Sequence, residues 1–475
     1  MSITKLDQMF DVIKSKSRKR IVAAFANDSH TISAVSGAVD LGIVEGILVG
    51  DEETIKKACK AENIDVNKFK IVQEANEYKA AAKAVEALRD SNFDGQIILF
   101  ADEEYLPYER PPLSKEYLAG KKSLADFTVQ NSDWYRDHDV DLRLQSRVSS
   151  LDPAAHTVGL PDDTVVHYDK LLLATGSASK RPPIPGSDAA GVHYLRTYDD
   201  AAALNSVLTE GAALAVVGAG WIGLEVAAGA RQRGVNVTVV ETAKQPLLAA
   251  LGETVGEVFA DLHRDHGVDL RLETQVEEIT TADGKATGLK MRDGSTVSAD
   301  AVLVAVGAKP NVELAERAGL SMGDGGVLVD ASLRTSDPDI YAVGDIAAAE
   351  NPLFNTRIRT EHWANALKQP AVAAAGMLGK PGEYDELPYF FTDQYDLGME
   401  YVGHAPSFER VVFRGDISGR EFVAFWLDGD SRVLAGMNVN IWDVLDDVKA
   451  LIRSRTPVDA DKLADPQAPL ADLVS

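Results

Sequence analysis

Hydrophobic residues near the N-terminus gather in three short runs separated by helical patterns. The runs are RIVAAFA (20–26), EGILVGD (45–51) and FKIVQ (69–73). Between them, residues 30–42 and 52–64 place apolar side chains at helical spacing. Strands that alternate with helices predict an α/β layout with parallel strands.

The last part of the chain follows a different pattern. From about Pro388 onward, four segments rich in apolar residues follow one another at residues 389–403, 409–415, 420–429 and 432–440. They predict successive antiparallel strands, and the spacing over residues 440–455 predicts a helix after them. Composition also changes near residue 80, from Ile, Lys and Asn to Ala, Asp, Arg and Gly. We interpret that change as a domain boundary.

Length and charge narrow the class of protein. The 475 residues suggest about three domains. The net charge of −25 argues against nucleic acid or an anionic membrane as a partner, because both are bound chiefly by clustered Lys and Arg. No apolar run approaches the roughly 18 residues of a membrane span, and MSITKLDQMF lacks the apolar stretch of a signal peptide. We therefore expect a soluble, cytoplasmic protein.

The single cysteine limits the redox chemistry. Cys59 has no second cysteine to pair with, which excludes an intramolecular disulfide, a CxxC pair, a cysteine-based zinc site and an all-cysteine iron–sulfur cluster. We predict no metal site. Any redox reaction must then use a bound cofactor.

A dinucleotide-binding pattern spans residues 213–242. Gly218, Gly220 and Gly223 have G-x-G-x-x-G spacing between two apolar runs, and Glu241 ends the second run. Glycines at this spacing allow a tight turn, close approach of the pyrophosphate, and close packing of helix on strand. A carboxylate at Glu241 can bind the ribose 2′-OH and would repel a 2′-phosphate, which favours NADH, although Lys244 lies nearby. The alternative is a glycine turn that serves packing alone.

Two further segments flank this pattern. Ala174, Thr175 and Gly176 follow one buried run, and Gly344 and Asp345 follow another. Either alone would suit an ordinary strand end. In this order they resemble the paired segments that return the chain to the first dinucleotide domain in flavoproteins with two such domains.

From about Ala80 to the C-terminus the chain resembles the FAD-dependent ferredoxin reductases of oxygenase systems, a branch of the pyridine nucleotide-disulphide oxidoreductase family. YLPYERPPLSKEYL (105–118) matches the branch's most specific loop. The resemblance implies two Rossmann-like domains, for FAD and NAD, and a C-terminal α+β interface domain, with an α/β segment before them. We predict an N-terminal segment at 1–78, the FAD domain at 79–195 and 321–387, the NAD domain at 196–320, and the interface domain at 388–475.

The same resemblance assigns site residues. Glu103 would bind the flavin ribose, and Asp345 the ribityl chain near the pyrophosphate. The other implied cofactor contacts are Arg110, Pro111, Lys115, Ala174, Thr175, Gly176, Gly307, Gly344 and Trp363. RTEHWANALKQ and FFTDQYDLG place five residues around the isoalloxazine ring: Glu361, His362, Trp363, Asp393 and Gln394. Phe391 stands where the family usually has tryptophan, which bears on the electron-exit surface.

The implied reaction is hydride transfer from NADH to FAD, followed by single electrons to a 2Fe-2S ferredoxin, by a monomer or homodimer. The catalytic candidates are Lys115, which would stabilise the reduced flavin, and Glu361, which would pair with it. A plain surface salt bridge for that pair, and a core role for Trp363, are the alternatives. Other possible activities are an NADH oxidase and a reductase of a small acceptor.

The first glycine turn of the FAD domain is missing. Alignment puts Asn76, Tyr78 and Ala81 at its three glycine positions, and the turn also carries Glu74 and Glu77. Side chains there would block the pyrophosphate, and the two carboxylates repel it. We therefore predict weakly held or absent FAD, the alternative function being an NADH-binding chimera without reductase activity.

Residues 1–78 instead resemble the N-terminal part of phosphate acetyl- and butyryl-transferases, without the acyl- and phosphate-binding half. We assign no acyltransferase activity. The chain resembles a join of two families, made within a helix. We expect the strand KIVQ (70–73) and the helix over residues 78–89 to occupy the slots of the missing first strand and helix.

Overall fold

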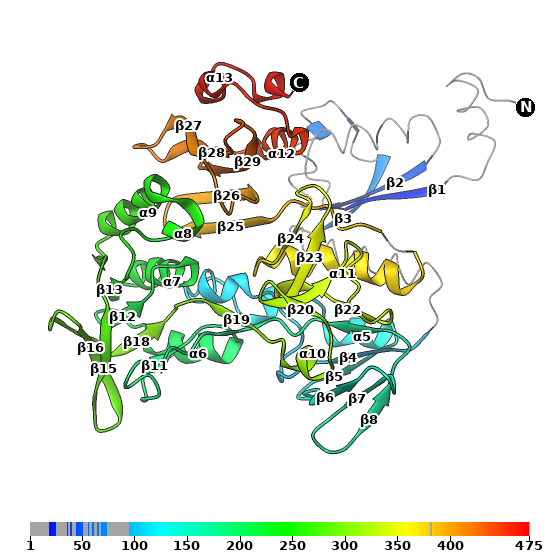
Figure 1. The fold of residues 1–475 in the computed structure, drawn as a ribbon, viewed down its shortest axis with the longest axis horizontal. Coiled ribbons are helices and arrows are strands. Elements are labelled where there is room, and N and C mark those ends of the chain that lie inside the picture. Colours follow the sequence, from blue (N-terminus) through cyan, green and yellow to red (C-terminus); the bar gives the residue numbers. More distant parts are fainter. Residues whose placement is uncertain are drawn as a thin grey trace, which may run out of the picture. The chain divides into compact units, whose positions relative to one another are not determined.

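The structure, a computed structural model, describes residues 19–24, 36, 39, 44–50, 56, 59–60, 64–65, 68–73, 95–380 and 382–474 (Figure 1). The chain forms two compact units. The first comprises residues 1–108 and 128–147, and the second comprises residues 109–127 and 148–475.

The described residues of the first unit form two sheets. β1 (Lys19–Ala24), β2 (Val44–Gly50) and β3 (Phe69–Gln73) form a parallel sheet in that order, which confirms the predicted strands and their direction. β4 (Ile97–Phe100) pairs in parallel with β5 (Val140–Arg143), and α5 (Ser132–Asp137) leads into β5.

The predicted placement of KIVQ in the FAD domain is wrong. β3 pairs with β2 over five residue positions, whereas β4 pairs with β5. β1 and β2 precede β3 in the sequence, and β3 completes the sheet that these two strands form. The helix predicted at 78–89 lies outside the described residues.

The second unit includes a five-stranded parallel sheet with the order expected of a Rossmann domain. Its central strand, β12, is apolar throughout and mostly buried, as suits a strand covered on both faces. In sheet order the strands are β11 (Val192–His193), β18 (Ala301–Val304), β12 (Ala213–Val217), β13 (Asn236–Val240) and β14 (Asp269–Arg271). Its helices are α6 (Tyr198–Val207), α7 (Trp221–Gln232), α8 (Leu248–Leu251) and α9 (Glu253–Asp265). An antiparallel sheet joins them: β15 (Val276–Ala282), β16 (Lys285–Met291) and β17 (Thr296–Ser298).

Segments on both sides of this domain pair with each other. β9 (Leu171–Leu173) lies parallel to β22 (Ile340–Ala342), and β10 (Ser177–Ser179) lies antiparallel to β19 (Ala308–Pro310). The chain therefore leaves and re-enters one region around the inserted domain. The other strands here are β6 (Ser150–Asp152), β7 (Thr157–Gly159), β8 (Val165–His167), β20 (Met322–Gly323), β21 (Gly326–Val329), β23 (Ala347–Asn351) and β24 (Thr356–Ile358). The helices are η2 (Pro111–Ser114), η3 (Leu124–Phe127), α10 (Glu313–Arg317), η4 (Gly344–Ile346) and α11 (Trp363–Met377).

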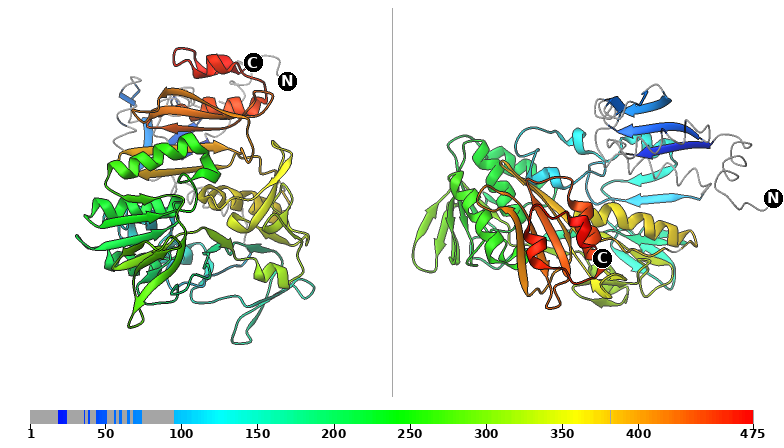
Figure 2. Two further views of the ribbon diagram at one scale, coloured as in Figure 1. Left: turned by 60° about the vertical axis from the view of Figure 1, so that its left-hand side comes forward. Right: turned by 90° about the horizontal axis from the view of Figure 1, so that it is seen from above.

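The C-terminal segment forms the predicted antiparallel sheet, drawn in orange in Figure 2. In sheet order it contains β25 (Tyr389–Gln394), β26 (Leu397–Gly403), β29 (Val433–Val439), β28 (Glu421–Leu427) and β27 (Arg410–Asp416). The following helix, α12 (Leu445–Ser454), begins later than predicted because Asn440 and Asp443 have left-handed φ angles of 51° and 63°. α13 (Ala460–Ala464) and η5 (Leu470–Leu473) end the chain's regular structure.

Among the described residues, none of the helices combines the length and apolar character needed to cross a membrane.

Candidate active site

Two of the three glycines in the 213–242 pattern are required by the fold itself. Gly218 has a φ of +103°, and a Cβ on it would lie 2.5 Å from the carbonyl oxygen of Ala305. A Cβ on Gly223 would lie 2.2 Å from the carbonyl oxygen of Gly218. These contacts are the tight turn and the helix–strand packing that the pattern predicts.

The middle glycine is explained differently. Gly220 caps α7 with φ −82° and ψ −176°, angles that any residue adopts, and a Cβ there would meet nothing within 4 Å. Neither backbone strain nor packing requires glycine at this position. Open space above the first N–H groups of a helix suits an anion such as pyrophosphate, so packing alone does not account for the pattern.

Glu241 lies at the end of β13, beside this turn. Its Oε2 accepts a hydrogen bond from the Ala219 N–H at 2.8 Å, and its Oε1 accepts one from the Ala243 N–H at 2.9 Å. The carboxylate is thus fixed where a ribose would follow the pyrophosphate. Lys244 forms an ion pair with Glu253 at 2.5 Å.

The two flanking segments come together as predicted. Leu173 lies opposite Ala342 in the parallel β9–β22 pair, so the Ala174–Gly176 and Gly344–Asp345 turns leave the same edge. Asp345 is buried, and its Oδ2 accepts hydrogen bonds from Ser177 Oγ at 2.7 Å and Arg196 Nη2 at 2.6 Å. These are not ordinary strand ends, because a buried, ionisable side chain joins them.

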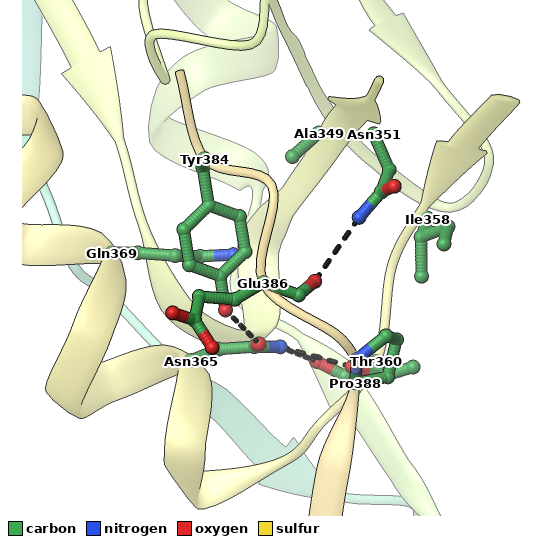
Figure 3. A pocket seen from close by; sticks show the side chains of 9 residues that line it. All are labelled: Ala349, Asn351, Ile358, Thr360, Asn365, Gln369, Tyr384, Glu386 and Pro388. Atoms are coloured by element: carbon green, nitrogen blue, oxygen red, sulfur yellow. Dashed lines mark hydrogen bonds between the residues drawn. The ribbon is translucent and has the colours of Figure 1, made fainter. Parts of the chain in front are cut away.

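Helix α11 positions the backbone of Gly344. This glycine has a φ of +75°, a Cβ there would meet nothing within 4 Å, and its N–H donates to Gln369 Oε1 at 2.7 Å. Gln369 also lines a cavity of about 10 Å³, room for a single water, with Tyr384 and Asn365 (Figure 3). The Tyr384 hydroxyl donates to Asn365 Oδ1 at 3.2 Å, and burial raises the pKa of Tyr384. We interpret this small cavity as support for the turn.

Arginine side chains give this edge a local positive charge. Arg110 Nη1 donates to the Arg196 carbonyl at 2.5 Å, and Arg196 pairs with Asp345. Burial lowers the pKa of Arg196, and its buried Nε has no hydrogen-bond partner in the part of the chain that the structure describes. Two neighbouring arginines, one of them paired with a carboxylate, suit a phosphate. The sequence analysis did not identify Arg196, because its only local feature is that it precedes the N-cap of α6.

Lys115 follows η2, and its ammonium reaches α7. Its Nζ lies 2.9 Å from Glu225 Oε1 and 4.9 Å from the centre of the Phe391 ring. The predicted pairing of Lys115 with Glu361 is wrong: Glu361 pairs with Arg359 at 2.5 Å, because the two side chains lie two residues apart on one extended segment. Glu225 was missed, although a charge on the buried face of the helix after the glycine turn was visible in the sequence.

Three more side chains complete the surroundings of Lys115. Ser114 Oγ donates to Glu225, and Thr392 Oγ1 donates to Glu225 Oε1 at 2.6 Å. Trp363 contacts Phe391 edge-on, with ring centres 5.9 Å apart.

The remaining predicted residues have separate places. His362 contacts Phe390 at 4.8 Å between ring centres, and burial lowers its pKa to about 4. Gln394 is buried against His263, whereas Asp393 points to the opposite face of β25. Gly307, with φ +105°, lies before β19 near Lys180, and Pro111 begins η2.

Glu103 and the predicted residues within 74–81 are not part of this group of contacts. Glu103 belongs to the first unit, where its Oε2 accepts a hydrogen bond from the Tyr108 hydroxyl at 2.5 Å. Glu74, Asn76, Glu77, Tyr78 and Ala81 lie outside the described residues. The described residues supply groups that suit the ring and ribityl end of a flavin, namely the buried carboxylate of Asp345, the open Gly344 turn and the Lys115 ammonium. The pyrophosphate end has no glycine turn in the sequence.

Comparison with known proteins also assigns the early and the later part of the chain to different families. Residues 79–370 match the pyridine nucleotide-disulphide oxidoreductase family, and residues 389–474 match the family described as reductase C-terminal. Residues 5–101 match phosphate acetyl/butaryl transferase. The resemblance to two families that the sequence predicted is confirmed.

Individual relatives cover most of the chain after the join. The ferredoxin–NAD(+) reductase component of the anthranilate 1,2-dioxygenase system of Burkholderia cepacia is 40% identical over 387 residues, 82% of this chain and 95% of that protein. Putidaredoxin reductase of Pseudomonas putida is 36% identical, over 83% of this chain and 94% of that protein. The crystal structure of the covalent putidaredoxin reductase–putidaredoxin complex matches with a TM-score of 0.79 and 34% identity, covering 84% of this chain and 96% of that one. From residue 79 onward, this chain belongs to the pyridine nucleotide-disulphide oxidoreductase family.

Proposed function

We propose that the chain is an NADH-dependent flavoprotein that passes electrons to a 2Fe-2S ferredoxin. The observation that carries the proposal is the position of Glu225. It lies on α7 five residues after Gly220, so the helix whose first turn faces the dinucleotide also holds the Lys115 ammonium. Five residues span about 7.5 Å of helix, a distance short enough for both functions to belong to one site.

The chain's own residues bind and orient. Gly220 leaves room for the pyrophosphate of NADH, and Glu241 accepts hydrogen bonds from its ribose. Asp345 and Gly344 would hold the ribityl chain of FAD, with Arg110 and Arg196 near its phosphate. FAD, when bound, supplies the chemistry that accepts a hydride and releases single electrons. Lys115, held by Glu225, would place a positive charge near the flavin ring, where it would stabilise the reduced form.

The relatives support this assignment. The relative from Burkholderia cepacia is a ferredoxin–NAD(+) reductase component, and the structural neighbour was crystallised with putidaredoxin. We propose a cytoplasmic monomer or homodimer with the predicted segments 1–78, 79–195, 196–320, 321–387 and 388–475 as its domains.

A second candidate is an NADH-binding protein with little or no flavin. It rests on the sequence at 74–81, which carries no glycine where the first pyrophosphate turn should be. The comparisons favour the reductase.

One experiment separates the candidates. NADH consumption is measured with a generic dye, with a 2Fe-2S ferredoxin and with oxygen, before and after free FAD is added. The reductase requires NADH-driven reduction of dye and ferredoxin, with the Glu225→Gln variant slowed and Thr335→Val, a buried control on another turn, unchanged. NADH binding without consumption, not rescued by FAD, would establish the second candidate. Rapid transfer to oxygen alone would indicate an oxidase.

A further inference from the structure

A chain of buried polar side chains leads away from the Lys115–Glu225 pair. Glu225 accepts from Thr392, Thr392 Oγ1 accepts from Gln394 Nε2 at 3.2 Å, and Gln394 Oε1 lies 2.8 Å from His263 Nε2. Their exposed fractions are 6% for Glu225, 0% for Thr392, 1% for Gln394 and 0% for His263. Burying four polar side chains is costly unless each finds a hydrogen-bond partner. A continuous hydrogen-bonded run of this kind holds its members in one arrangement.

The donors in this chain all point toward Glu225. Burial lowers the pKa of His263 to about 4, so the ring is neutral near pH 7 and carries one N–H. That hydrogen lies on Nε2, because the Gln394 oxygen can only accept. The Gln394 amide then donates to Thr392, whose hydroxyl hydrogen is left to face Glu225 Oε1.

This chain of hydrogen bonds holds the Glu225 carboxylate in place. Oε1 of Glu225 accepts from Thr392 and contacts Lys115 Nζ, while Oε2 accepts from Ser114. Thr392 and Gln394 alternate on β25, so both face the same side of the C-terminal sheet. Glu225 and His263 come from α7 and α9 of the NAD domain. A residue of the C-terminal domain thus completes a site otherwise built from other segments.

We propose that Thr392 is a positioning residue for hydride transfer: its hydroxyl, aimed by Gln394 and His263, orients Glu225 and thereby the Lys115 ammonium. The kinetic part of this proposal rests on the proposed function. The positional part does not, because it concerns the Lys115 side chain alone.

The positional test measures acylation of Lys115 by acetic anhydride in the full chain. Mass spectrometry follows the Lys115 peptide relative to the exposed Lys309, in the wild type and in Thr392→Val, Thr392→Ser and Gln394→Leu variants. Thr335→Val is the matched control, because Thr335 is another buried threonine whose hydroxyl bonds to a backbone carbonyl.

Valine keeps the shape of threonine but removes the hydroxyl that holds Glu225. We expect Lys115 to label about tenfold faster in Thr392→Val, the effect of losing one hydrogen bond to a charged group. Thr392→Ser and Thr335→Val should label within about twofold of the wild type, and Gln394→Leu should lie between these limits. Labelling of a folded Thr392→Val at the wild-type rate would overturn the proposal, as would an equal rise in Thr335→Val.

The kinetic test uses dye reduction by NADH with FAD supplied. Thr392→Val should lower kcat about tenfold with KM for NADH unchanged, and Thr392→Ser should restore it. A rise in KM with kcat unchanged would overturn the positioning role. If the wild type itself reduces no dye, the proposed function fails, and the labelling result still decides whether Thr392 positions Lys115.

Discussion

Replacing Gly220 by alanine separates binding from stability. A Cβ at Gly220 meets no protein atom within 4 Å, and its φ of −82° is open to alanine. Alanine is a poorer N-cap than glycine by about 1 kcal/mol, but it also restricts the unfolded chain by about 0.4–1 kcal/mol. These terms nearly cancel, so we expect the free energy of unfolding to change by less than about 1 kcal/mol.

NADH binding should respond strongly to the same methyl group. The methyl would occupy the space that the pyrophosphate needs in order to reach the N–H groups at the start of α7. Losing one hydrogen bond to a charged group costs roughly 1.5–3 kcal/mol, which raises Kd about 10- to 100-fold. Gly223→Ala provides the contrast. Its Cβ would lie 2.2 Å from a backbone oxygen, so we expect a stability loss of about 1–3 kcal/mol.

Both quantities can be measured on the same samples. Urea unfolding gives stability, and quenching of the adjacent Trp221 follows NADH binding during a titration. Gly220→Ala should retain the unfolding midpoint and lose affinity. If Gly220→Ala binds NADH with the wild-type Kd, the open space above α7 is not the pyrophosphate site, and the argument fails.

Four further predictions follow from the site. Glu241→Ala should lower the preference for NADH over NADPH by about tenfold in paired titrations, because the repulsion of a 2′-phosphate is lost; an unchanged preference would contradict that role. The folded pKa of His263, about 4, lies below its ordinary value, so its stabilising effect is full above about pH 6.5 and falls by about 3 kcal/mol toward pH 4. Urea unfolding of His263→Gln should show a flatter acid side, and an equally steep one would count against this. Glu225→Gln should slow dye reduction at least about tenfold while Glu361→Gln stays within about twofold, and the reverse order would restore the pairing expected from sequence. Purified protein should contain less than one flavin per chain by visible absorbance after gel filtration, because residues 74–81 lack glycine; a stoichiometric yellow protein would refute the predicted loss.

Local patterns were predictable, and contacts across the fold were not. The turn at Gly218–Gly223 follows from spacing within one βαβ unit, and the strands after Pro388 follow from short apolar runs. Glu225, Arg196 and Thr392 have partners more than a hundred residues away, so no local pattern identifies those partners. The placement of β3 in the FAD domain was predicted wrongly, because an apolar strand carries no signal for the neighbour with which it pairs.

The join near residue 78 affects the first glycine turn and leaves the other described contacts of the site intact. The contacts that hold Lys115, Asp345 and the Gly218–Gly223 turn are made among residues 109–127 and 148–474. The different sequence before residue 79 therefore leaves these contacts in place, and the chain carries Asn76, Tyr78 and Ala81 where the family resemblance implies glycines. A nucleotide-binding turn works through bare main chain, so side chains at its glycine positions are enough to impair it. NADH binding and flavin retention thus become separable properties of one chain, and each has to be measured without inferring it from the other.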